Sequence, residues 1–162
     1  MQKKNKPMDS IKQEFEENGF VILEKALDDE DVSGLNDKLD IVYSQAIINA
    51  GADLKDFQSL DEKYVFLRDS HPELKARAYD LTKHLEIMSR YAVKRRIIET
   101  VVNIVGNEVL VDFPQVRIDD PMNNRLLPLH QEGYGQISDN VVTAWIPLQD
   151  VDPEVGTLAV EL

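Results

Sequence analysis

The sequence contains no cysteine. A disulfide framework, a zinc site built on thiolates and a cysteine nucleophile are therefore excluded, and the absence agrees with the cytoplasmic location that we expect. Long hydrophobic runs are also missing, since none approaches the ~20 apolar residues needed to cross a bilayer, so we predict no membrane span. No apolar segment follows the lysines near the N-terminus, which disfavours a secretory signal, and residues 1–8 are expected to form a flexible tail.

Positive charge is scarce as well. The chain has 18 Lys and Arg residues against 30 Asp and Glu residues, which gives a net charge of −12. Such a surface disfavours nucleic acid as a partner, because binding to phosphates needs basic side chains, and it equally disfavours anionic membranes. Hydrophobic residues make up 43% of the 162 residues, enough for one globular domain, which we place at residues 9–162. We expect a small-molecule substrate as the partner.

Signals for helices dominate the first part of this domain, about residues 9–106. Asp9 and Ser10 can cap a helix over residues 11–18, and Gly19 can end it in a left-handed conformation. A short buried strand is predicted for residues 20–23. Acidic residues at 28–31 favour the start of a second helix that fades near residue 50, with an apolar stripe of Val32, Leu35, Leu39, Val42 and Ala46.

Further helices are expected after a mixed segment at residues 52–70. His71 and Pro72 open one of them, because proline is tolerated in the first turn of a helix. The core face of this helix consists of Leu74, Ala78, Leu81, Leu85 and Met88. Another helical stretch covers roughly residues 90–105 and stops at Gly106. Since His71 and His84 lie in helical stretches, we do not expect either to be a metal ligand.

From about residue 107 the hydrophobic period changes from helical to strand-like. Strands are predicted at residues 108–113, 115–119, 127–132, 140–148 and 157–162, with Pro, Gly, Asn and Asp between them. Helices followed by a run of strands favour an α+β domain with an antiparallel β-layer. Gln115 and Arg117 alternate with apolar residues in one predicted strand, which either lies at the surface or lines a polar cavity.

The triplet His130-Gln131-Glu132 carries the clearest chemistry. Residues two apart in a strand point to the same face, so the imidazole of His130 and the carboxylate of Glu132 can converge on one point. Such a pair makes two thirds of the 2-His-1-carboxylate triad that holds non-haem Fe(II). Taken alone, a triplet of this kind is more often a surface pair or a satisfied histidine, so its sequence context decides the interpretation.

That context is the block QVRIDDP…RLLPLHQE…SDNVVTAWIPLQDVDPEVGTLAVE. It resembles the phytanoyl-CoA dioxygenase (PhyH) family of Fe(II)- and 2-oxoglutarate-dependent oxygenases, and the early segment at residues 19–23 is similar to the opening of that family. The resemblance implies N-terminal helices packed on a double-stranded β-helix (jelly-roll, cupin-like) core. It also implies a dioxygenase that uses Fe(II), 2-oxoglutarate and O2 to hydroxylate a small-molecule or acyl substrate.

The resemblance further suggests roles for individual residues. His130 matches the first iron-binding histidine, and Glu132 matches the iron-binding carboxylate, which is most often Asp in the family. Trp145 matches a position next to 2-oxoglutarate, and Gln115 falls on another position that lines this cosubstrate. Arg117 has no firm counterpart, and on charge grounds we expect it to meet a carboxylate of the cosubstrate or the substrate.

The second iron histidine of the family has no match, because no histidine follows His130 in this chain. We therefore expect the N-terminal part of an oxygenase domain, with an incomplete β-core at about residues 107–162. Its exposed sheet edge could pair two copies into an oligomer. One alternative is a truncated or degenerate, non-catalytic homologue that acts as a binding or interaction protein. Another is a cupin-like metal-binding or isomerase module, which would normally show more histidines in the strand region.

Overall fold

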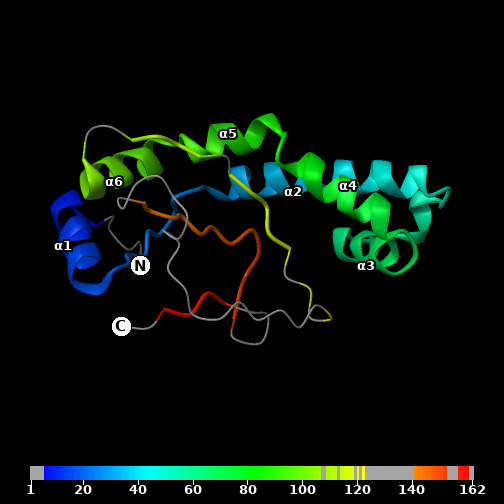
Figure 1. Cartoon of the computed structure of the whole chain (residues 1–162), viewed down its shortest axis with the longest axis horizontal. Coiled ribbons are helices and arrows are strands. Elements are labelled where there is room, and N and C mark those ends of the chain that lie inside the picture. The colour runs from blue at the N-terminus through cyan, green and yellow to red at the C-terminus, as the bar shows by residue number, and fades with distance from the viewer. Residues whose placement is uncertain are drawn as a thin grey trace. The chain divides into compact units, whose positions relative to one another are not determined.

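The structure is a computed structural model that describes residues 6–106, 109–112, 114–118, 120, 122, 141–152 and 157–160. Its described residues form α-helices and one short 3-10 helix, shown in Figure 1. These elements are α1 (Met8–Asn18), α2 (Asp29–Asn49), η1 (Leu54–Asp56), α3 (Leu60–Ser70), α4 (Pro72–Thr82), α5 (Glu86–Ala92) and α6 (Arg95–Val105). None of the described helices is long and apolar enough to cross a membrane.

The chain divides into two compact units. The helix-pair unit contains α1 and α6, which pack against each other. The bundle unit contains α2, η1, α3, α4 and α5, together with the segment Asp112–Arg117. Each unit has buried apolar side chains of its own, so each is described separately below.

The helix-pair unit begins with a helix whose end the sequence predicts correctly. The predicted cap is wrong, because α1 starts at Met8 and Asp9 and Ser10 lie within its first turn. Gly19 follows the last residue of α1 with a φ of 76°, and its N–H donates a hydrogen bond to the carbonyl of Phe15 at 2.8 Å. This left-handed cap suits glycine, which has no Cβ to clash with the backbone. Ile11 is only 2% exposed, and the amide of Asn103 on α6 donates to the carbonyl of Met8 at 2.7 Å. Apolar burial and one polar contact therefore hold the two helices together.

The bundle unit is built on α2, whose start was also predicted correctly. The Asp28 carboxylate accepts a hydrogen bond from the N–H of Asp31 at 3.0 Å, and the Asp31 carboxylate accepts one from the N–H of Asp28 at 3.2 Å. This reciprocal capping box satisfies N–H groups that have no partner within the helix. The acidic residues also complement the positive end of the helix dipole.

The buried face of α2 differs in part from the predicted stripe. Its buried residues are Leu35, Leu39, Tyr43, Ala46 and Ile47. Val32 and Val42, which were predicted to belong to the stripe, are only half-buried. A row spaced by four residues, from Leu35 to Ile47, runs along the helix and faces the neighbouring helices. The sequence therefore predicts this helix correctly and its buried face only in part.

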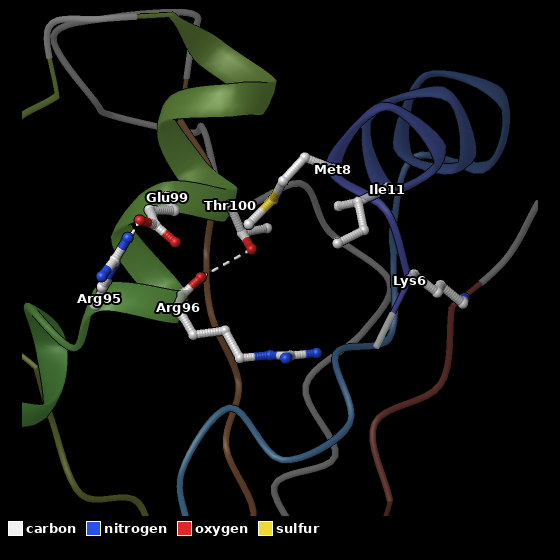
Figure 2. Close-up of a pocket in the computed structure, with 7 residues that line it drawn as sticks. All are labelled: Lys6, Met8, Ile11, Arg95, Arg96, Glu99 and Thr100. Atoms are coloured by element: carbon white, nitrogen blue, oxygen red, sulfur yellow. Dashed lines mark hydrogen bonds and ion pairs between the residues drawn. The ribbon is translucent and has the colours of Figure 1, made fainter. Parts of the chain in front are cut away.

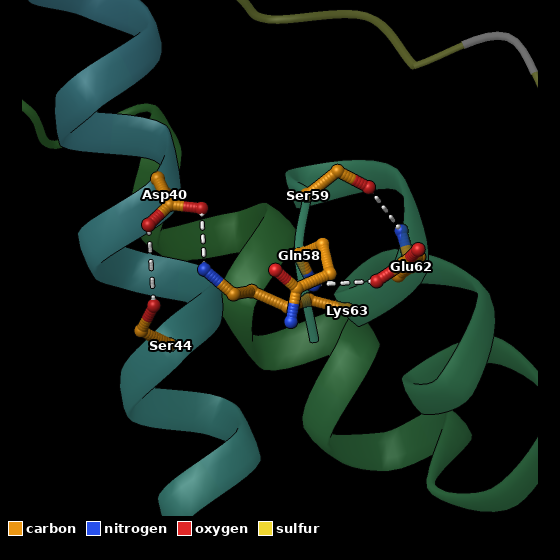
Figure 3. Close-up of polar contacts among 6 residues, drawn as sticks. All are labelled: Asp40, Ser44, Gln58, Ser59, Glu62 and Lys63. Atoms are coloured by element: carbon orange, nitrogen blue, oxygen red, sulfur yellow. Dashed lines mark hydrogen bonds and ion pairs between the residues drawn. The ribbon is translucent and has the colours of Figure 1, made fainter. Parts of the chain in front are cut away.

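Helices α3 and α4 pack against α2 and against each other, as Figure 1 shows. Ser59 caps α3 by accepting a hydrogen bond from the N–H of Glu62 at 3.2 Å, while the Glu62 carboxylate accepts one from the N–H of Gln58. Figure 3 shows this cap beside an ion pair in which Lys63 Nζ lies 2.6 Å from Asp40 Oδ1 on α2. The segment at residues 52–70, which the sequence left undecided, is therefore largely helical.

One helix predicted after His71 is two helices in the structure. α4 does begin at Pro72, but it ends at Thr82, and α5 begins at Glu86. The Thr82 hydroxyl donates to the carbonyl of Tyr79 at 2.7 Å, and the N–H of Leu85 donates to the carbonyl of Thr82 at 3.2 Å. These tighter turns redirect the chain. Consequently Leu81, a predicted core residue, is exposed.

The break places α5 against α2. Its buried residues are Ile87, Met88 and Tyr91, and the Tyr91 hydroxyl donates to the carbonyl of Asp31 at 2.6 Å. The following helix, α6, is separate from α5 and ends before Gly106, as the sequence predicted. The last predicted helix therefore has the correct end and begins later than expected.

The predicted fold class is wrong: no described residue lies in a β-strand, so the α+β fold with a jelly-roll core is not what the described chain forms. The predicted strands include described residues at 20–23, 109–112, 114–118, 141–148 and 157–160, and none of these segments pairs with another. Apolar side chains that a sheet would cover are exposed, namely Ile22, Leu110, Leu158 and Val160. Alternating residues bury a face only where backbone ladders form, and the described segments have none. The described residues therefore provide no sheet edge through which two copies could pair.

Candidate functional site

The two predicted metal ligands, His130 and Glu132, lie outside the described residues. The same holds for the predicted strand at 127–132 that would have carried both side chains. The predicted ligand pair therefore stays a prediction from the sequence.

Gln115 and Arg117, predicted to contact the cosubstrate, belong to the bundle unit. Both are exposed, whereas Val116 between them is only 4% exposed. Exposure therefore alternates along this segment as the sequence predicted, although the backbone is not a strand. The buried valine anchors the segment and leaves the two polar side chains at the surface of their unit.

Trp145, the third predicted cosubstrate residue, belongs to the helix-pair unit. It is 43% exposed, and its neighbours Thr143 and Ala144 are exposed as well. The segment at 141–147 has no regular secondary structure. In the described chain Trp145 is thus a large apolar side chain that is partly open to solvent.

The donor groups available for iron can be compared with the requirement of a facial triad. One imidazole and one carboxylate, from His130 and Glu132, fit two of the three positions that Fe(II) needs. The described residues supply no group of three His, Asp or Glu side chains that could hold a metal ion. The His71 ring packs on Phe66, with ring centroids 5.4 Å apart, and His84 is exposed. The two predicted ligands are therefore of a chemical type that suits Fe(II), and the described residues do not by themselves form a metal-binding group.

The described chain does contain a cavity, within the helix-pair unit. It has a volume of about 350 Å³ and is lined by Lys6, Met8, Ile11, Arg95, Arg96, Glu99 and Thr100. Figure 2 shows Met8 and Ile11 on α1 opposite Arg96 and Thr100 on α6, whereas Arg95 points away from α1 and lies beside Glu99. The Nε of Arg95 lies 2.6 Å from Oε1 of Glu99, and this hydrogen bond raises the pKa of Arg95 above its ordinary value.

Arg96 is the lining residue that sequence reasoning missed. Its Nε is buried and has no hydrogen-bond partner among the described residues, while its backbone carbonyl accepts a hydrogen bond from the Thr100 hydroxyl at 2.9 Å. A signal was present in the sequence, because Lys94, Arg95 and Arg96 form a run of three basic residues in a strongly acidic chain. The cavity itself could not be foreseen, since it requires α1 and α6 to be neighbours.

Comparison of the chain with protein-family models, with curated proteins and with solved structures finds no match. In the described residues, all regular secondary structure is helical.

Proposed function

We propose that this chain is an Fe(II)- and 2-oxoglutarate-dependent dioxygenase that hydroxylates a small-molecule or acyl substrate. The observation that carries the proposal is the spacing of His130 and Glu132 within the sequence block that resembles PhyH-like oxygenases. The proposal rests on this pair and its sequence context.

Each proposed residue has a role that follows from its chemistry. His130 would give a neutral imidazole nitrogen and Glu132 an anionic oxygen, which together suit Fe(II). The Arg117 guanidinium would pair with a carboxylate of 2-oxoglutarate or of the substrate, because its planar fork matches a carboxylate. Gln115 and Trp145 would line the cosubstrate. When bound with 2-oxoglutarate and O2, Fe(II) supplies the oxidising power for C–H hydroxylation.

The proposal is tested by titrating the full chain with Fe(II) under anaerobic conditions in the presence of 2-oxoglutarate. A bound chelate gives a weak visible charge-transfer band, which we expect to rise saturably with iron. His130→Ala should abolish this band, because it removes the imidazole donor. Glu132→Asp should retain it, since aspartate supplies the same kind of oxygen.

His84→Ala is the matched control, because His84 is exposed and lies between α4 and α5. This variant should leave the band unchanged. After O2 is admitted, succinate should accumulate in the wild type and not in His130→Ala. A band that His130→Ala leaves intact would show that iron binds elsewhere, and the proposed ligands would then be wrong.

A non-catalytic binding or interaction protein is the second candidate. It is favoured by the sequence, in which no histidine follows His130, so that the second iron-binding histidine of the resembled family has no match. If the folded chain binds no iron and gives no band, this second function applies and the dioxygenase proposal is wrong for these 162 residues.

A further inference from the structure

The cavity between α1 and α6 is lined by more positive than negative charge. Lys6, Arg95 and Arg96 face it with a single acidic lining residue, Glu99, in a chain whose net charge is −12. Two of the three cations are paired within the protein: Arg95 with Glu99, and Lys6 Nζ with the Glu14 carboxylate, each at 2.6 Å. The positive charge that is left over resides on Arg96.

The Arg96 guanidinium is held in a place where it needs an acceptor. Its Nε is shielded from solvent and has no hydrogen-bond partner in the part of the chain that the structure describes. A buried charged donor without an acceptor is costly, because it has lost water and gained nothing in return. Figure 2 shows the side chain extending from α6 along the cavity, below Ile11. An anion in the cavity would give the positive charge of this guanidinium a partner, through its terminal nitrogens.

The start of α6 adds to the preference for an anion. Lys94, the residue before the helix, makes no side-chain cap, and the first turn of α6 contains no acidic residue. The positive end of the helix dipole is therefore not offset by a side chain of the first turn, unlike that of α2. The dipole and the unpaired guanidinium favour a negative group at the same end of the cavity.

The remaining walls of the cavity are apolar. Met8 is half-buried, Ile11 is nearly fully buried, and Thr100 is buried with its hydroxyl bonded to the backbone of Arg96. A volume of about 350 Å³ accommodates a small molecule. The occupant that fits both parts of the cavity has a charged head for Arg96 and an apolar tail for Met8 and Ile11.

We propose that this cavity is a binding site for a small carboxylate with an apolar tail, with the carboxylate paired to the Arg96 guanidinium. A planar carboxylate matches the two parallel donors of the guanidinium. A phosphate dianion is a poorer match, because one unpaired guanidinium neutralises half of its charge and Glu99 lies nearby. The site needs no iron, so this proposal can be tested independently of the dioxygenase proposal.

The test uses the intact, metal-free chain and hexanoate as the probe. Titration followed by NMR should show saturable shifts of the Arg96 Nε–H and of the Thr100 methyl group. Arg96→Met keeps an unbranched apolar side chain and removes the charge, and it should weaken hexanoate binding at least tenfold. Arg90→Met is the matched control, because Arg90 on α5 is not one of the residues that line the cavity and pairs with Glu86 at 3.0 Å. It should leave the affinity unchanged.

Two further probes define the class of ligand. Acetate should bind more weakly than hexanoate, because it has no tail to contact Met8 and Ile11. Inorganic phosphate should bind more weakly than hexanoate as well. The proposal is overturned if hexanoate gives no saturable shifts at millimolar concentrations, if Arg96→Met binds it as tightly as the wild type, or if phosphate binds more tightly. Should Arg96→Met fail to fold, Arg96→Lys keeps the charge, loses the fork and is expected to bind several-fold more weakly.

Discussion

Tyr43 is the residue at which burial and chemistry conflict most directly. Its ring is fully buried in the bundle unit, yet no described residue gives its hydroxyl a hydrogen-bond partner. Burial is the main cause that raises the pKa of this hydroxyl, and the nearby Tyr64 and Tyr79 raise it further. The ring fills the core, while the oxygen has lost its hydration without compensation.

Tyr43→Phe should therefore stabilise the protein at neutral pH. It keeps the ring that packs 6.1 Å from Tyr64, centroid to centroid, and removes the unsatisfied hydroxyl. We expect the free energy of unfolding to rise by about 1 kcal/mol, measured by urea denaturation. Tyr79→Phe is a matched control, because Tyr79 is only half-buried. A loss of stability in Tyr43→Phe would show that the hydroxyl has a partner after all.

The same substitution should change the response to alkaline pH. In the unfolded chain Tyr43 loses its proton near its ordinary pKa of about 10. The folded state holds the proton to higher pH, because burial raises the pKa. Above that ordinary value the unfolded state therefore binds fewer protons than the folded state, so stability falls as pH rises. Tyr43→Phe should show a shallower fall between pH 9 and 11 than Tyr79→Phe, a range on either side of about 10.

At the scale of elements, the ion pair between Asp40 on α2 and Lys63 on α3 is asymmetric. The Lys63 side chain is 9% exposed and the Asp40 side chain is 44% exposed. Removing the carboxylate leaves a buried ammonium group without its ion-pair partner, whereas removing the ammonium leaves a carboxylate that water can reach. The two substitutions should therefore differ in cost.

Asp40→Ala is expected to lower the free energy of unfolding by about 2 kcal/mol, between the values for exposed and buried pairs. Lys63→Met should cost less, because methionine keeps the apolar stem that packs between the helices. Urea denaturation of both variants and of the double variant measures the pair and its asymmetry. Equal costs, or a larger cost for Lys63→Met, would contradict this account.

Element boundaries were the part of the fold that the sequence predicted best. Gly19, the acidic run at 28–31, Pro72 and Gly106 mark ends that α1, α2, α4 and α6 have in the structure. These signals act locally, through caps and backbone angles, and depend little on the rest of the chain. The break after Thr82 was missed, because no glycine or proline marks it and it depends on how α5 meets α2.

At the scale of the whole molecule, prediction failed where distant segments must meet. Around Val116 the predicted alternation of buried and exposed residues is correct, and the predicted strand is wrong, because a strand exists only with a paired neighbour. The cavity at Arg96 was missed for the same reason, because its walls come from α1 and α6, which are far apart in the sequence. The predicted iron ligands, in contrast, rest on their spacing and sequence context, and they stay a prediction.

Most of the core of the bundle unit lies within residues 27–93, so this segment should fold in isolation. The buried apolar residues of α2, α3, α4 and α5 all lie within this segment, namely Leu35, Leu39, Tyr43, Ala46, Ile47, Tyr64, Leu67, Ala78, Ile87, Met88 and Tyr91. A peptide of residues 27–93 should therefore be helical by circular dichroism and should unfold cooperatively on heating.

The isolated segment should nevertheless be less stable than segment 27–93 joined by a flexible linker to residues 112–117. Val116 is buried in the bundle unit, and losing its packing should cost about 1 kcal/mol, a fall of roughly 4–8 °C in melting temperature for a domain of this size. Val116→Ala in the linked form should lower the melting temperature by most of the same amount. Gln115→Ala, at an exposed neighbour, should leave the melting temperature unchanged. An unfolded 27–93 peptide would contradict an independent core. Equal melting temperatures with and without residues 112–117 would instead show that Val116 is not part of that core.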